Sequence, residues 1–249
     1  MPRSSDTGHA KNIATAGHLI EDCRKLATGY RPSNEALKIA ALELLYNNAL
    51  TAHQVADRSV AAFLQATQLR REDFRLAEAL STRVVKAFSA SGASPQAMEQ
   101  IRAAHRRLKG WRKSPVDEAP PAATGKTEPH ASRSVSQRSY DMMATNFERL
   151  IDVCRQEASY KPEETDLTIA ALQATLQRLN AHNMAVPSAE SEKMTKIRNR
   201  NDVLYKAETG LVDTGNRVKA YAQSLDPKKH PEARALFGRH RFGKIKQGK

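Results

Sequence analysis

The sequence lacks features that would place the protein in a membrane or outside the cell. The 249-residue chain contains no run of about 18 apolar residues, and a helix needs a run of about that length to cross a bilayer. Its first residues contain no apolar stretch of secretory length. We therefore expect a cytoplasmic protein with no membrane span.

Cysteine is scarce as well. The chain has two, Cys23 and Cys154, and each follows a Leu-Ile pair in an amphipathic pattern. A thiol in such a position commonly serves as a small core residue. None of the eight histidines forms a His-x₃-His pair or stands beside a Cys-x-x-Cys motif, so no metal site is predicted.

Familiar catalytic motifs are also missing. The chain has no P-loop, no dinucleotide-binding glycine pattern, no His-Glu-x-x-His and no Gly-x-Ser-x-Gly. Paired carboxylates such as Glu163 and Glu164 fit helix caps or surface ion pairs better than acid–base chemistry. We expect a protein that is not an enzyme, with no catalytic residue, no cofactor and no small-molecule substrate.

The composition favours helices. Aromatic residues make up only 5% of the chain, while Ala and Leu recur throughout. That balance suits helix-on-helix packing better than a sheet, which would be rich in β-branched and aromatic residues. The predicted fold class is all-α.

The two halves of the chain resemble each other. Residues 19–24 read Leu-Ile-Glu-Asp-Cys-Arg, and residues 150–155 read Leu-Ile-Asp-Val-Cys-Arg. A Tyr-x-Pro motif and an Ile-Ala-Ala-Leu motif follow in the same order in both halves. Collinear matches of this kind indicate a duplicated domain. We predict two homologous antiparallel helical bundles in tandem.

Composition sets the predicted boundaries. Residues 114–138 contain four prolines, several Ser and Ala, and charges that cancel, which is typical of a flexible linker. We expect a disordered N-terminus at 1–10, a first bundle at 11–113, the linker at 114–138, a second bundle at 139–245, and a basic tail at 246–249.

Each predicted bundle has three main helices and a short terminal one. The apolar spacing places the first helix over residues 13–26, and the Tyr-x-Pro motif predicts that the second begins near Pro32, with its copy near Pro162. No Gly or Pro interrupts residues 33–91. One helix of that length would be improbable in a small domain, so we expect a reversal at the polar residues 70–73.

The positions of the later helices are predicted from loop-forming residues and from helix-capping residues. The third helix is expected over residues 76–90 and 211–224, the second copy following a loop-like insertion near residues 205–210. The terminal helix should begin at Ser94, where Ser can cap and Pro can occupy the first turn, and near Pro231 in the second half.

The positive charge is concentrated at the end of each half. The formal net charge is +13, with basic clusters at residues 102–113 and 228–249. Two cationic segments joined by a linker could bind one polyanion with added avidity. The candidate nucleic-acid-binding residues are Arg102, Arg106, Arg107, Lys109, Arg112, Lys113, Lys228, Lys229, Arg234, Arg239, Arg241, Lys244 and Lys246.

Two functions remain open. In the first, the basic ends bind DNA or RNA backbones without strong sequence choice, and the nearby Trp111, Phe237 and Phe242 either stack on bases or, as we favour, anchor the terminal helices. In the second, the protein is a scaffold that associates with itself or with another protein. Its best candidate apolar patch is Val55, Phe63, Leu64 and Leu69.

Several motifs also suggest a family. The Leu-Ile-x-x-Cys-Arg, Tyr-x-Pro and Ile-Ala-Ala-Leu motifs, with Arg-Ser-Val-Ser-Gln-Arg-Ser-Tyr at residues 133–140, resemble a group of uncharacterised bacterial tandem helical-repeat proteins of unknown function. The resemblance covers most of the chain and implies the duplicated fold. It implies no catalytic or binding residue.

Overall fold

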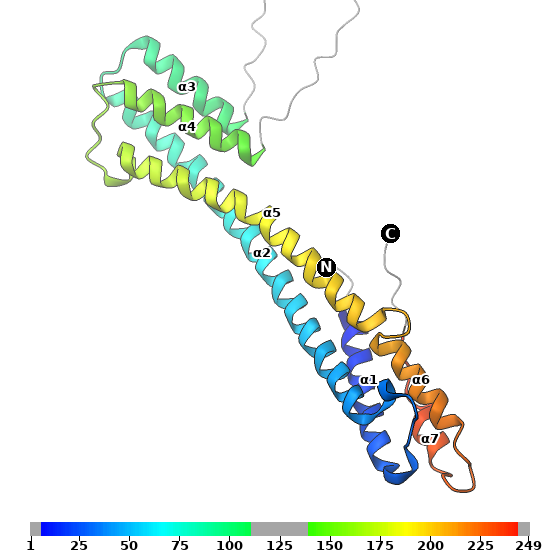
Figure 1. The fold of residues 1–249 in the computed structure, drawn as a ribbon. Coiled ribbons are helices and arrows are strands. Elements are labelled where there is room, and N and C mark those ends of the chain that lie inside the picture. Colours follow the sequence, from blue (N-terminus) through cyan, green and yellow to red (C-terminus); the bar gives the residue numbers. More distant parts are fainter. Residues whose placement is uncertain (1–5, 111–138, 244–249) are drawn as a thin grey trace, which may run out of the picture. The chain divides into compact units, whose positions relative to one another are not determined.

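Helices are the regular elements of this protein. The structure, a computed structural model, describes residues 6–110 and 139–243, and it has no strand within these ranges (Figure 1). The all-α prediction is confirmed. The helices are α1 (Asp6–Lys25), α2 (Ile39–Ala90), α3 (Pro95–Lys109), α4 (Tyr140–Gln156), α5 (Ile169–Tyr205), α6 (Leu211–Gln223) and α7 (Ala233–Gly238).

The chain divides into two compact units, and each takes helices from both halves of the sequence. The terminal unit comprises Met1–Phe63 and Ala189–Lys249, and the central unit comprises Leu64–Ser188. Helices α2 and α5 contribute to both units. The units therefore differ from the expected domains at 11–113 and 139–245.

Helix α2 explains this difference. It runs unbroken from Ile39 to Ala90, so the reversal expected at residues 70–73 is wrong. Those residues are polar but helix-compatible, and without Gly or Pro the backbone hydrogen bonds continue through them. The 52-residue helix is about 80 Å long at 1.5 Å per residue. Because α2 does not reverse, α3 packs beside α4 in the central unit (Figure 1) and not beside α1.

The second helix of each half begins later than predicted. Helices α2 and α5 start at Ile39 and Ile169, not near Pro32 and Pro162. A 3₁₀ turn precedes each start, at Glu35–Leu37 and Thr165–Leu167. The following residues, Lys38 and Thr168, are extended, with ψ near 150°. This extended residue separates each 3₁₀ turn from the long helix that follows it.

Other local predictions are confirmed. The Ser94 hydroxyl accepts a hydrogen bond from the Ala97 N–H at 3.2 Å, with Pro95 in the first turn of α3. Helix α6 spans Leu211–Gln223 after a turn in which Gly210 is required, because an added Cβ would lie 2.7 Å from the Lys206 backbone. The last helix, α7, begins at Ala233 and has only six residues.

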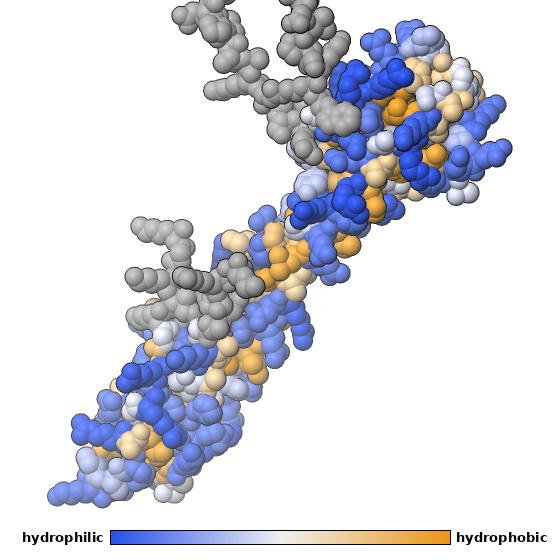
Figure 2. Space-filling view, turned by 180° about the vertical axis from the view of Figure 1, so that it is seen from behind, coloured by the Kyte–Doolittle hydropathy of each residue, from blue (hydrophilic) through white to orange (hydrophobic). Residues whose placement is uncertain are grey.

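Each unit has its own apolar core. In the central unit, Phe88, Ile101, Phe147 and Leu172 from α2, α3, α4 and α5 are fully buried together. In the terminal unit, α1 packs on α6 and α7, and its buried residues include Leu19, Cys23, Val218 and Phe237. Figure 2 shows a largely hydrophilic surface interrupted by small hydrophobic patches on the face drawn.

A tyrosine hydrogen bond occurs at the same place in both halves, in the segment between α1 and α2 and in that between α4 and α5. The Tyr30 hydroxyl donates to the Leu37 carbonyl at 2.7 Å, and the Tyr160 hydroxyl donates to the Leu167 carbonyl at 2.8 Å. Both tyrosine side chains are buried. These bonds satisfy a carbonyl at the end of each 3₁₀ turn, where the backbone has no helical partner.

Both cysteines are expected to resist chemical modification in the folded protein. They are free and buried, and burial is the main cause that raises the pKa of Cys23 and of Cys154 to about 12. A protonated, covered thiol is a poor nucleophile. A thiol-reactive disulfide reagent should label neither residue at neutral pH and both in denaturant. Fast labelling of either under native conditions would contradict the burial. Because the two lie in different units, Cys23→Ser and Cys154→Ser variants would report the opening of each unit separately.

Candidate anion-binding surfaces

Helix α3 presents most of the first basic cluster. Its Ile101, Ala104 and Leu108 are buried in the core of the central unit. Its His105 ring lies 3.2 Å from the Thr82 hydroxyl of α2. Gly110 then ends the helix with φ 70, in the left-handed conformation that glycine favours. One face of α3 is thereby fixed against the core. Away from that face Arg102 and Arg107 are exposed, while Arg106 and Lys109 are half-buried.

Arg102, Arg106 and Lys109 lie on that outer side. Positions separated by four and three residues follow one face of a helix, and these three are not among the buried residues of α3. Within the described residues, no carboxylate lies within ion-pair distance of them or of Arg107. The helix therefore carries a row of uncompensated positive charge.

Cations elsewhere are often neutralised. Exposed arginines pair with carboxylates in several places: Arg24 with Glu21 and Glu43, Arg75 with Glu72, Arg83 with Asp166, Arg155 with Asp152, and Arg178 with Asp73. An anion approaching these arginines must compete with the carboxylate already present. On α3 the one carboxylate is the exposed Glu99, three residues before Arg102, and no ion pair joins it to Arg102, Arg106 or Lys109 within the described residues. Arg112 and Lys113, predicted to belong to the same cluster, lie outside the described residues.

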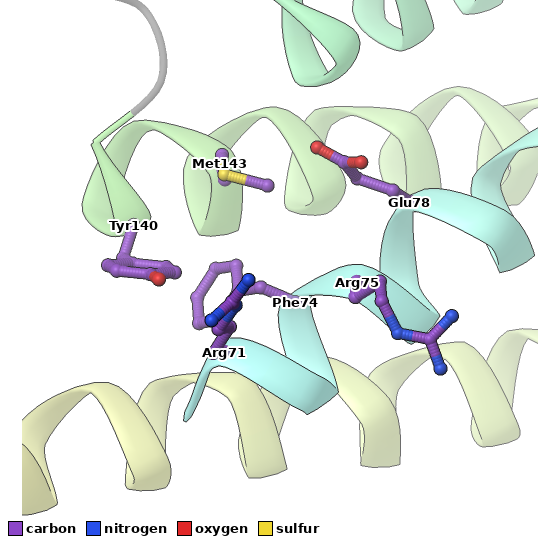
Figure 3. Close-up of a pocket in the computed structure, with 6 residues that line it drawn as sticks. All are labelled: Arg71, Phe74, Arg75, Glu78, Tyr140 and Met143. Carbon is purple, nitrogen blue, oxygen red and sulfur yellow. The ribbon is translucent and has the colours of Figure 1, made fainter. Parts of the chain in front are cut away.

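A small pocket of about 200 Å³ lies in the same unit, at the start of α4 (Figure 3). Tyr140 and Phe74 meet edge to face there, with ring centroids 4.8 Å apart. The Arg70 guanidinium lies 4.2 Å from the centre of the Tyr140 ring. The remaining lining residues are Arg71, Arg75, Glu78 and Met143. Two arginines and one glutamate line the pocket, so its charge is net positive, and the Arg70 guanidinium covers one face of the Tyr140 ring. Neither Arg71 nor Tyr140 was predicted as a site residue.

The second basic cluster lies in the terminal unit. Lys228 and Lys229 are exposed in the turn before α7, Arg234 is exposed on α7, and Arg241 is exposed after it. Lys244 and Lys246 lie outside the described residues. The two basic clusters therefore belong to different units. Helices α3 and α4, which precede and follow residues 111–138 in the chain, pack together within one unit, so the structure does not confirm the expected arrangement of two tandem bundles.

Arg239 differs from the other predicted residues because it is already paired. Its Nε and Nη2 donate to the carboxylate of Asp22 on α1 at 2.5–3.2 Å. The ring Nε2 of His240 lies 2.8 Å from the same carboxylate, and Lys25 donates to it at 2.9 Å. Only 1% of the Asp22 side chain is exposed. Arg239 therefore holds the end of the chain onto α1.

The charge of Asp22 is stabilised by its partners. Burial by itself raises the pKa of a carboxyl group. Here the hydrogen bonds from Lys25, Arg239 and His240, with the charge of Arg239, outweigh burial and lower the pKa of Asp22 to about 2. The carboxylate is therefore ionised at all pH values near neutrality.

The sequence contained a signal for this buried carboxylate. Asp22 aligns with Val153 of the second half, within the matched segments 19–24 and 150–155. A valine at the corresponding position indicates a place that is at least partly covered, where a carboxylate requires hydrogen-bond partners. The partners, more than 200 residues away in sequence, could not be identified from the pattern.

The segment after α7 runs along α1 in the opposite direction. Beyond the contacts to Asp22, Asn12 exchanges two hydrogen bonds with the backbone of Gly243, at 2.8 and 2.9 Å. The Phe242 ring lies so close to Gly215 of α6 that a Cβ there would be 2.4 Å away. Phe237 is fully buried. For Phe237 and Phe242 the structure favours anchoring over base stacking; Trp111 lies outside the described residues.

Other classes of site find little support in the described chain. No three His, Cys, Asp or Glu side chains of residues 6–110 and 139–243 gather closely enough to hold a metal ion. None of the helices in these ranges is both long and apolar enough to span a membrane. No family model, curated protein or solved structure matches the chain.

Proposed function

We propose that this protein binds the phosphate backbone of nucleic acid, with the outer face of α3 as its main contact surface. The observation that carries the proposal is the row formed by Arg102, Arg106 and Lys109, which has no carboxylate partner among the described residues. Phosphate contacts need only accessible Lys and Arg side chains, and released counterions provide much of the affinity. The net charge of +13 adds long-range attraction for a polyanion.

Single strands are the favoured form. The row spans the eight residues from Arg102 to Lys109, which is about 10 Å of helix axis, enough for neighbouring phosphates of one strand. The half-buried ring of Tyr140 lies in the same unit. An unpaired base would stack on it by replacing the Arg70 guanidinium that now covers one face of the ring. No element of the row reads base edges, so we expect little sequence preference.

Fluorescence anisotropy across a salt series tests this proposal. Labelled single-stranded RNA, single-stranded DNA and duplex DNA would be titrated with the intact protein from low to physiological salt. Three phosphate contacts on a single strand predict a log–log slope of about −2. Single strands should bind more tightly than the duplex. Binding that is absent at physiological salt would contradict the proposal and leave solubility as the role of the charge.

A scaffold is the second candidate, and a specific observation favours it. Several large apolar side chains are strongly exposed: Leu44 at 63%, Leu64 at 60%, Met184 at 73% and Met194 at 56%. Of the patch predicted earlier, Leu64 and Leu69 are exposed, while Phe63 is half-buried beneath the Lys193 ammonium. Contiguous apolar patches mediate association; Leu44 and Met194 belong to the terminal unit, and Leu64 and Met184 to the central unit. Light scattering at high salt would show a stable oligomer if this is the role, and a strict monomer would count against it.

We also propose that the two halves descend from one duplicated helical segment. The matching Tyr30 and Tyr160 hydrogen bonds support this, as do the equivalent 3₁₀ turns before Ile39 and Ile169. Membership of the uncharacterised bacterial tandem helical-repeat proteins remains a prediction from the sequence motifs. The duplication would explain why each half ends in a basic cluster.

A further inference from the structure

A second anion site is suggested by a pocket in the terminal unit. The pocket, of about 390 Å³, lies between α1 and the segment that follows α7. Its lining residues are Thr15, His18, Arg239 and His240. Three are basic side chains and the fourth carries a hydroxyl group, so all can donate hydrogen bonds. No carboxylate lines it.

The arginine in this pocket is already oriented. Two nitrogens of Arg239, Nε and Nη2, are bound to Asp22, and 55% of the side chain remains exposed. The other nitrogen, Nη1, has no hydrogen bond to a described residue. A guanidinium held on one edge presents its free N–H groups in a fixed direction, which lowers the entropy lost when an anion binds.

The charge around the pocket is positive overall. The buried negative charge of Asp22 faces the cations of Lys25 and Arg239. The other carboxylate near His18, that of Glu21, is paired with Arg24. Lys219, which is half-buried, is a third cation near the pocket, since its ammonium donates to the carbonyl of the lining residue His240 at 2.6 Å. No ion pair joins Lys219 to a carboxylate in the described part of the chain. Asp22 is enclosed and already accepts from three side chains. An anion in the pocket would therefore face excess positive charge and no exposed carboxylate from the lining.

We infer that this pocket binds a phosphate group, either as inorganic phosphate or as the end of a phosphomonoester. A tetrahedral anion with several acceptor oxygens matches a lining that offers a guanidinium, an imidazole and a hydroxyl as donors. The inference is independent of the proposed function, because α3 belongs to the other unit.

Thermal shift and calorimetry with inorganic phosphate test this site on the full-length protein. Phosphate should raise the melting temperature above that measured in sodium chloride of equal ionic strength, because it binds the folded form. The double variant Thr15→Val with His18→Gln removes two donors outside the Asp22 cluster. We expect it to weaken phosphate binding about tenfold or more, the loss expected for charge-assisted hydrogen bonds.

A matched control separates the pocket from general electrostatics. Lys11→Gln removes an exposed charge from the same helix without touching the pocket, and it should bind phosphate as the wild type does. Equal phosphate responses in the wild type and the double variant would overturn the inference, as would a wild type that responds no more to phosphate than to chloride.

Competition identifies the source of the phosphate group. Displacement of phosphate by ribose 5-phosphate, but not by ribose, would support the site and assign it to soluble phosphomonoesters. Displacement by a 5′-phosphorylated oligonucleotide, but not by its 5′-hydroxyl form, would support it and assign it to a nucleic-acid end. Competition by ribose or by the 5′-hydroxyl oligonucleotide alone would count against a phosphate site.

Discussion

Replacing Arg102, Arg106 and Lys109 by Glu is expected to reduce single-strand binding about 100-fold or more at physiological salt. Each lost phosphate contact removes nearly one released counterion from the binding equilibrium, and the new carboxylates repel the backbone. The salt dependence should become markedly shallower in the variant. Anisotropy with one labelled oligonucleotide measures both effects.

The control is a pair of Gln triple variants that change the net charge equally. Gln at Arg102, Arg106 and Lys109 would be compared with Gln at Arg24, Arg83 and Arg155, each of which has a carboxylate partner. If the α3 row is the contact surface, the first set should weaken binding far more than the second. Equal losses would show that binding depends on net charge alone and would contradict a role for α3.

Substitution of Asp22 by Asn is expected to lower the free energy of unfolding by about 2 kcal/mol or more at neutral pH. The pKa of Asp22 falls from 3.8 to about 2 on folding, and each pKa unit corresponds to about 1.4 kcal/mol. The exposed cations Arg239 and Lys25 can regain water after the change, whereas the buried His240 cannot, so this value is the smallest loss expected. Urea unfolding followed by circular dichroism measures it.

The same carboxylate predicts how stability depends on acid. Its pKa is lower in the folded protein than in the unfolded chain, so its contribution is present above about pH 4 and disappears as the pH falls toward 2. The wild type should lose stability steeply over that range, and Asp22→Asn should lose less. The matched variant Asp152→Asn, at an exposed ion pair in the second half, should change stability little. Similar effects of the two substitutions would contradict the special role of Asp22.

Sequence patterns predicted local structure well where one residue type decides it. Ser94 followed by Pro95 marks the start of α3, and Gly210 precedes α6. Pro32 predicts an earlier start for α2, whereas the Tyr30 contact and the turn at Glu35–Leu37 delay the start to Ile39. Such a delay depends on tertiary packing and is not visible in local preferences.

Packing partners could not be predicted from the sequence. Periodicity shows which face of α1 or α4 is buried, but it does not show which helix covers that face. The reversal expected at residues 70–73 follows from the assumption that each half folds as a separate small domain. That assumption is wrong, because α2 is continuous and belongs to both units. The basic clusters were visible in the sequence, but the pairing of Arg239 with Asp22 required the structure.

Cutting the chain between its two halves tests the arrangement of helices most directly. A protease site placed within residues 111–138 would separate a fragment with α1, α2 and α3 from one with α4 to α7. Because α1 packs on α6 and α7, and α3 packs on α4, the cut fragments should remain associated and elute together in gel filtration, separating only in denaturant. Two folded fragments that elute separately would show that each half forms its own bundle and would contradict the exchange of helices described above.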